Sequence, residues 1–275
     1  MDRIPHTARW LAALALASCQ LLVAGCGADP EAAPAVPSVG VWYRGQPPGV
    51  PQRDDLAVMK ALDFSSVTWP SGSTEHLDEL QRLAKASRLA VVTRDRPIPV
   101  TPSSALAPGE YVDVGVAALP PDSIAPLVWR AVAHGGRIIS FDPGNLAGSG
   151  LANVNGEAPP WIPAAKGLSR QISFNTALIA ALRPGPTVTI DAPKPKDLDV
   201  VLLEVERSWL IVATSTSYAP LKATVHLPPT VPYALWVSMI DGSNMSMLDE
   251  AAGPTWKLDF PAFGVCVYVI DKKLK

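Results

Sequence analysis

The spacing of apolar residues changes once along this chain, at Pro184-Gly185-Pro186, and that change limits what each half can fold into. Before it, short apolar runs alternate with segments whose apolar residues recur at helical spacing, as Leu77, Leu80 and Leu83 do. After it, apolar and polar residues alternate in short, closely spaced runs. A helical period between strands favours a parallel sheet, and a period of two favours antiparallel strands. The sequence therefore predicts an α/β part over residues 39–185 and an antiparallel β-sandwich over residues 186–275.

The α/β part is expected to contain five strands, at residues 39–44, 64–69, 89–93, 111–116 and 137–141. Helices are predicted over residues 74–87, from a cap at Asp122 or Ser123 as far as Gly135, and over residues 161–182. Residues 97–108 are rich in proline and serine and are expected to form a loop. The sandwich is expected to have strands at residues 187–191, 198–205, 209–214, 221–227, 234–240 and 265–270.

The first 25 residues have the parts of a bacterial export signal. Arg3 and Arg9 make the start basic, and residues 10–23 are apolar almost throughout. That run of about 14 residues is shorter than the roughly 20 that a helix needs to span a bilayer. It leads into Val23-Ala24-Gly25-Cys26, which resembles the bacterial lipobox. The resemblance implies cleavage before Cys26 and a lipid on its thiol that holds the protein to a membrane of the cell envelope.

Residues 26–38 are predicted to be a linker, because prolines interrupt an Ala/Glu-rich segment that has no apolar period. In a Gram-negative cell, Gly27 replaces the aspartate associated with inner-membrane retention, which favours the outer membrane. The alternative to a lipoprotein signal is an ordinary secretory signal with an incidental cysteine, or a short membrane anchor. The formal net charge of −2 gives no indication of nucleic acid as a partner. Cys266, within an apolar strand, is expected to be a buried side chain rather than a nucleophile.

Residues 129–142, WRAVAHGGRIISFD, resemble the last helix–strand step of glycoside-hydrolase (β/α)₈ barrels. Residues 160–166, 170–175 and 182–185 are similar to the closing helix of such barrels. The second half of the chain is similar to the β-sandwich that follows them, and the resemblance covers roughly residues 39–94 and 110–270. It implies a barrel-like α/β part and a carbohydrate ligand.

Two features depart from that family. Residues 39–183 supply only about 145 residues, whereas a complete (β/α)₈ barrel needs at least ~200. The shortfall lies between Thr93 and Tyr111, so we expect a reduced or partial TIM-like barrel followed by the sandwich. Many enzymes of the family carry their acid/base glutamate directly after an asparagine at the end of strand four. This chain has no Asn-Glu pair, which counts against glycosidic cleavage.

Candidate site residues lie where the predicted strands end, because barrel chemistry gathers at the carboxyl ends of strands. Glycoside hydrolysis needs two carboxylates, and aromatic rings stack on sugars. The candidates are Asp95 and Asp142 as a catalytic pair, with Arg44, Trp69 and Glu157 as ligand contacts.

The alternative for the two carboxylates is structural. Asp95 would then pair with its neighbour Arg94 or Arg96, and Asp142 would cap the turn before Pro143.

Other chemistries lack their motifs. The histidines show no metal-ligand spacing, and there is no nucleophile elbow, glycine-rich phosphate loop or Cys-x-x-Cys, so no metal or cofactor is expected. Three functions stay open. The preferred one is a lipid-anchored protein whose glycosidase-like domain binds a glycan without cleaving it. The others are a hydrolase with displaced carboxylates and an envelope scaffold without a ligand.

Overall fold

The computed structural model describes residues 37–45, 50–72, 74–95, 99–100, 111–144, 151, 158–229, 236–239, 245–247 and 255–272. The predicted signal, Cys26 and Glu157 lie outside these residues. One compact unit extends from Ala35 to the end of the chain. No helix in the described part of the chain is long and apolar enough to cross a membrane.

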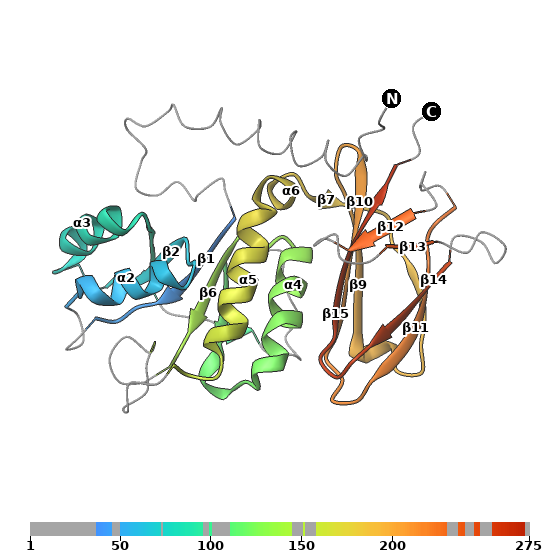
Figure 1. The fold of residues 1–275 in the computed structure, drawn as a ribbon, viewed down its shortest axis with the longest axis horizontal. Helices are drawn as coiled ribbons and strands as arrows, with labels where there is room; N and C mark the ends of the chain where they lie inside the picture. Colours follow the sequence, from blue (N-terminus) through green and yellow to red (C-terminus); the bar gives the residue numbers. More distant parts are fainter. Residues whose placement is uncertain are drawn as a thin grey trace, which may run out of the picture. The chain divides into compact units, whose positions relative to one another are not determined.

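Six parallel strands form the sheet of the α/β part (Figure 1). They are β1 (Ser38–Trp42), β2 (Ser66–Pro70), β3 (Ala90–Arg94), β4 (Pro99–Val100), β5 (Tyr111–Gly115) and β6 (Ile138–Asp142). The five strands predicted from the sequence are present. The prediction of a loop over 97–108 is wrong for Pro99 and Val100, which pair with Asp113 and Val114. A strand of two residues has no periodic pattern by which the sequence could reveal it.

The helices are α2 (Arg53–Ala61), α3 (Leu77–Ser87), α4 (Ile124–Ala133), α5 (Ile162–Phe174) and α6 (Thr176–Ala180), with 3₁₀ turns η1 (Val116–Ala118) and η2 (Pro121–Ser123). The single helix predicted over 161–182 is interrupted at Asn175. The Asn175 side chain donates to the carbonyl of Gln171, and the Thr176 hydroxyl donates to the carbonyl of Ile172. Such local side-chain bonds compete with the backbone bonds of a helix, and α5 ends there.

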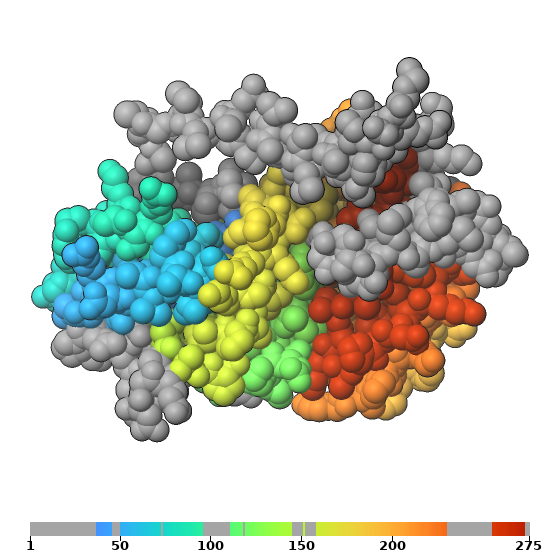
Figure 2. All heavy atoms as spheres, viewed as in Figure 1, coloured from blue at the N-terminus to red at the C-terminus, as the bar shows by residue number. Residues whose placement is uncertain are grey.

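The strand order β3-β2-β1-β6-β5-β4 is that of a singly wound sheet. Along the chain, each new strand is added on the same side of the strand before it. The exception is β4, which lies at the opposite end of the sheet from β3. Right-handed crossovers then place all the helices on one face, as in a (β/α) barrel, whereas doubly wound sheets carry helices on both faces. Figures 1 and 2 show α2, α5 and α4 side by side on this face. Within the described residues, β3 and β4 each pair with one strand, so a closed barrel is not seen.

Contacts on the opposite face show that the sheet is strongly curved. Strands lie about 4.8 Å apart, so β3 and β5, four steps apart, would be about 19 Å apart in a flat sheet. Arg94 on β3 nevertheless donates to Asp113 on β5 at 3.0 Å, a gap that these side chains cannot bridge across a flat sheet. Thr68 on β2 and Ser140 on β6 are 2.6 Å apart over β1. There Gly40 leaves room, since a Cβ would lie 2.3 Å from the Ser66 carbonyl oxygen.

The second half forms two antiparallel sheets, as predicted. The strands are β7 (Arg183–Pro184), β8 (Thr189–Asp191), β9 (Leu198–Glu204), β10 (Ser208–Ser215), β11 (Leu221–His226), β12 (Trp236–Met239), β13 (Met245–Met247), β14 (Thr255–Phe260) and β15 (Val265–Asp271). One sheet has the order β13-β12-β15-β10-β9-β7 and the other β14-β11-β8. A 3₁₀ turn, η3 (Pro195–Asp197), precedes β9.

Strand β10 is buried along its whole length because both of its faces are covered. Trp209 and Ile211 lie in the core between the two antiparallel sheets, whereas Leu210 and Val212 belong to the core of the α/β part. Arg130 and His134 at the end of α4 both contact Asp199 on β9, each at 2.8 Å. The change from parallel to antiparallel strands comes slightly before the predicted boundary at 184–186, because Arg183 and Pro184 of β7 already pair antiparallel with β9. Apolar packing continues across this boundary.

Candidate functional site

The concave face of the parallel sheet, away from the helices, carries polar side chains. Strand alternation directs Val39 and Val41 of β1 into the helix-side core, which leaves Trp42 on the concave face. The same alternation on the neighbouring strands adds Ser66, Thr68, Asp113, Ser140 and Asp142, all buried. Buried polar groups usually have hydrogen-bond partners, although the Ser66 hydroxyl has none among the described residues. The contacts of two carboxylates organise this face.

Asp113 on β5 is 1% exposed and accepts hydrogen bonds from two other strands. Trp42 Nε1 on β1 donates to Oδ1 at 2.7 Å, and an Arg94 guanidinium nitrogen on β3 donates to Oδ2 at 3.0 Å. The guanidinium also lies over the ring of Tyr111, 4.8 Å from its centre. Burying a carboxylate is costly unless it is paired and hydrogen-bonded, and Asp113 is both. The network therefore ties together β1, β3 and β5 across the concave face.

A second cluster lies at the carboxyl ends of β1 and β6. Two guanidinium nitrogens of Arg44 lie 3.1 Å from Asp142 Oδ1, and one also donates to the carbonyl of Gly144 at 2.7 Å. The backbone N–H of Gly144 donates to the same Asp142 oxygen at 3.0 Å. Gly144 has a φ of +68°, which suits glycine in this turn. The side chain of Arg44 is 35% exposed and that of Asp142 is 9%, so Arg44 is the accessible member of the pair.

The structure brings together Arg44 and Asp142 and gives the two predicted carboxylates different partners. Asp142 caps its turn, as the structural alternative predicted. Asp95 is exposed after β3 and accepts a hydrogen bond from Ser71. The alternative in which Asp95 pairs with Arg94 is wrong, because Arg94 pairs with Asp113 instead. Arg96, the other predicted partner of Asp95, lies outside the described residues.

The position of Trp69 corrects its expected role in stacking on a ligand. Its side chain is 1% exposed and lies with Val67 in the helix-side core, where its ring packs 5.7 Å from that of Tyr43. A ring without an exposed face cannot stack on a sugar. Glu157, the other expected ligand contact, and Cys26 lie outside the described residues.

Tyr43 holds the start of α2 against the same core. Its hydroxyl accepts a hydrogen bond from the Gln52 N–H at 2.7 Å and donates to Asp55 Oδ2 at 2.8 Å. Burial is the main reason that the pKa of Tyr43 lies well above its usual range, so the phenol stays protonated and keeps its donor role. Tyr43 is therefore a structural group on the side of the sheet opposite to Asp113.

Asp113 and Arg94 are the residues that the sequence reasoning missed as a site. The signal for Asp113 was present, because a charged residue between Val112 and Val114 in an apolar strand must find a buried partner. Nothing in the sequence indicated which partner. The sequence suggests Arg94 only as a partner for its neighbour Asp95.

These contacts limit the chemistry of the concave face. A glycosidase acid must donate a proton to the leaving group, whereas Asp113 and Asp142 both accept hydrogen bonds from guanidinium groups. Among the described residues, no three His, Cys, Asp or Glu side chains gather closely enough to hold a metal ion. The face can bind polar groups at Arg44, but among the described residues it presents no pair of unengaged carboxylates.

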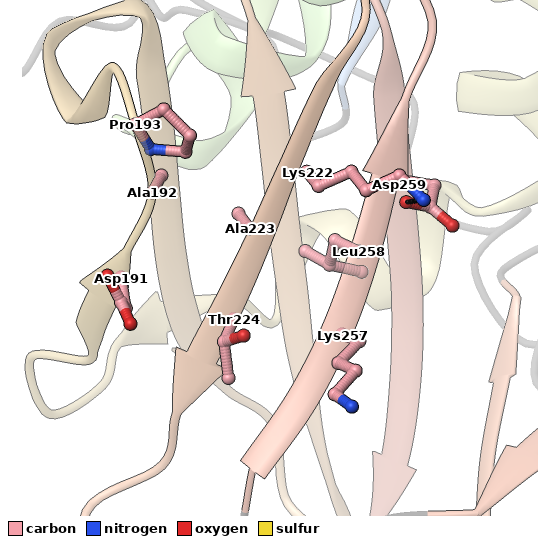
Figure 3. Close-up of a pocket in the computed structure, with 9 residues that line it drawn as sticks. All are labelled: Asp191, Ala192, Pro193, Lys222, Ala223, Thr224, Lys257, Leu258 and Asp259. Carbon is pink, nitrogen blue, oxygen red and sulfur yellow. Dashed lines mark ion pairs between the residues drawn. The ribbon is translucent and has the colours of Figure 1, made fainter.

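A separate hollow of about 520 Å³ lies on the exposed side of the β14-β11-β8 sheet (Figure 3). Its rim is charged, and Lys222 pairs with Asp259 at 3.5 Å across neighbouring strands, with both side chains largely exposed. Lys257 projects from β14 on the same surface. The hollow is distinct from the strand-end cluster of Arg44 and Asp142.

No family model and no curated protein matches the chain. It is similar to the solved structure of a glycoside hydrolase family 30 subfamily 8 xylanase from Clostridium acetobutylicum, with 14% identity over 79% of this chain and 59% of that one and a TM-score of 0.34. It is also similar to a maltogenic α-amylase from Thermotoga neapolitana, with 8% identity over 80% of this chain and 66% of that one and a TM-score of 0.40. An Anoxybacillus α-amylase is similar as well, with 10% identity over 82% of this chain and 57% of that one and a TM-score of 0.38. The chain spans between half and two thirds of the length of these enzymes. At such TM-scores the likenesses carry no argument about this chain.

Proposed function

We propose that this protein is a lipid-anchored protein of the bacterial cell envelope whose glycosidase-like α/β part binds a glycan without cleaving it. The lipid is placed on Cys26, and in a Gram-negative cell the outer membrane is the proposed location. In this proposal the curved sheet is the remnant of a (β/α) barrel without its middle strands. The observation that carries the non-hydrolytic part is that an arginine engages each of Asp113 and Asp142.

Support for a ligand comes from the strand-end cluster. Arg44 is partly exposed beside Asp142, and a guanidinium next to a carboxylate suits the adjacent hydroxyl groups of a sugar. Trp42 and Trp69 are both buried, so neither offers an aromatic platform. Binding should therefore depend on polar contacts and be weak.

The proposal that the protein does not cleave its ligand is tested with aryl glycosides. Loss of general-acid assistance alone removes a factor of roughly 10²–10⁴ in rate, so the purified full chain should show no turnover. Turnover that disappears in Asp142→Asn would overturn the proposal in favour of the hydrolase.

Glycan binding is tested by comparing Arg44→Gln with Arg53→Gln, an exposed arginine in the first turn of α2. On a glycan panel, Arg44→Gln should lose binding and Arg53→Gln should keep it. A wild-type chain that binds no glycan would remove the ligand from the proposal and leave the envelope scaffold.

The anchor is tested by cell fractionation and by labelling with a radioactive fatty acid. Cys26→Ser should abolish the label and either leave uncleaved precursor or release the protein from the membrane fraction. Cys19→Ser, within the apolar run of the signal, is the matched control and should behave as wild type. A Cys26→Ser protein that matures and fractionates normally would refute the lipid anchor.

A further inference from the structure

Helices α2 and α3 carry acidic residues in their first turns and basic residues in their last turns. In a βα unit the helix returns antiparallel to the strands, so helices begin at the carboxyl edge and end at the amino edge, where the next strand starts. The first turns of α2 and α3 contain only acidic charges after Arg53, namely Asp54, Asp55, Asp78 and Glu79. Their last turns contain Lys60 and Lys85. The topology therefore gathers bases at the amino edge.

The basic face consists of Lys60, Lys85, Arg88, Arg137 and Arg170. Arg137 directly precedes β6 and Arg88 lies two residues before β3, which places both at the amino edge. Among residues 60–65, 85–89 and 134–137, which lead into β2, β3 and β6, the one acid is Asp63, and it pairs with Arg170 at 2.7 Å. Lys60, Lys85 and Arg88 are exposed, and none of them forms an ion pair with another described residue. Helix dipoles account for bases at helix ends, and the bases at the ends of α2 and α3 form a positively charged surface. At the end of α4, Asp199 pairs with Arg130 and His134.

An exposed aromatic side chain lies at the same edge. Phe174, the last residue of α5, is 83% exposed. Arg170, one turn earlier in α5, contacts Asp63 at the amino edge, so Phe174 lies at or beyond that edge. A large apolar ring beside bases is the combination that peripheral proteins use to enter the interface of a bilayer.

The chain that would carry the lipid also leaves the unit at this edge. The backbone N–H of Ser38, the first residue of β1, donates to the carbonyl of Arg137 at 2.8 Å. Residues 27–37 separate Ser38 from Cys26, and even a fully extended chain across these twelve positions spans only about 40 Å. A lipid on Cys26 would therefore hold the protein within reach of the membrane from its basic side.

We propose that the basic face, together with Phe174, docks on the anionic phospholipid surface of the membrane that holds the anchor. This orientation rests on the proposed function. Each base close to an anionic surface strengthens binding about five-fold, so a few bases suffice once the lipid keeps the protein nearby. Docking in this orientation directs the carboxyl edge, with Arg44 and Asp142, away from the membrane and toward the ligand.

The test measures co-sedimentation of the full chain with vesicles of phosphatidylcholine alone and of phosphatidylcholine mixed with phosphatidylglycerol. All variants carry Cys26→Ser, so no lipid contributes. Binding to phosphatidylcholine alone reports the apolar leader, which every variant shares. The parent should bind the anionic vesicles more strongly, and Lys60→Gln/Lys85→Gln/Arg88→Gln should lower that binding about 100-fold. Phe174→Ala should lower it roughly five-fold.

The matched control is Lys194→Gln/Lys222→Gln/Lys257→Gln, which changes the net charge equally. Lys222 and Lys257 lie on the sheet of Figure 3, and Lys194 is an exposed residue that follows β8 in the sequence. It should keep the binding of the parent, and unchanged thermal midpoints would establish that all variants are folded. Equal losses in both triple variants, or equal binding of the parent to both kinds of vesicle, would overturn the proposal. Because these variants carry no covalent lipid on residue 26, the experiment tests docking alone. Failure of the anchor is reported separately by cell fractionation.

Discussion

Replacing Asp113 by alanine should destabilise the protein more than any surface substitution of a charged residue, because this carboxylate is the buried centre of a network that joins three strands. The change leaves Trp42 Nε1, in a side chain that is 1% exposed, without its acceptor. It also leaves the Arg94 guanidinium, 21% exposed, without its charge partner.

The expected magnitude follows from these two losses. Breaking a buried ion pair by removing one partner costs about 3–5 kcal/mol, and an unsatisfied buried donor alone costs about 1–3 kcal/mol. Water can reach part of Arg94, which lowers the first figure, so we expect the free energy of unfolding to fall by about 3 kcal/mol. Asp113→Asn keeps an acceptor for Trp42 and should cost about 1.5 kcal/mol.

The assay is urea unfolding followed by tryptophan fluorescence, with the free energy taken from the midpoint at constant slope. Asp259→Ala, which removes an exposed ion pair, is the control and should stay within about 0.5 kcal/mol of wild type. A double-mutant cycle of Asp113→Ala with Arg94→Ala should give a coupling of about 1–3 kcal/mol. A cost below about 1 kcal/mol together with additive single variants would refute the argument that this pair spans the concave face.

Two further predictions concern packing and pH. Gly40→Ala should lower stability by about 2–3 kcal/mol or prevent folding, since its Cβ would lie 2.3 Å from the Ser66 carbonyl oxygen. The control is Gly167→Ala in α5, whose Cβ would meet no atom within 4 Å and which should stabilise the protein by up to about 1 kcal/mol. The measurement is the thermal midpoint of each variant. Burial raises the pKa of the Cys266 thiol, and it also raises the pKa of Tyr268, which reaches about 12. The folded state therefore keeps protons that the unfolded chain releases above about pH 8.5. Stability should therefore fall as pH rises from about 8 to 10, and less steeply in Cys266→Ala; a midpoint that rises over this range would contradict the assignment.

Local pattern was enough to predict most elements and one feature of the site. The periods of apolar residues located the five longer parallel strands and the change to antiparallel strands, because each period reflects how side chains alternate within a single element. The turn at Asp142 was also foreseen as an alternative, since an aspartate that caps its own turn depends only on residues next to it. The break of the last helix at Asn175 depended on two side-chain bonds that a period cannot reveal.

The tertiary structure alone decided which polar residues meet. Asp113 lies 71 positions from Trp42 and 19 from Arg94, and the contacts exist because strand order and curvature bring β1, β3 and β5 together. The alternation of side chains along a strand predicts that Trp69 and Thr68 face opposite sides of β2, but it does not predict which side the helices cover. That side is set by the handedness of the crossovers and by the direction in which strands are added, which are properties of the whole sheet. A period in the sequence describes one helix or strand at a time. It therefore predicts where strands end, but not which side chains on other strands those residues contact.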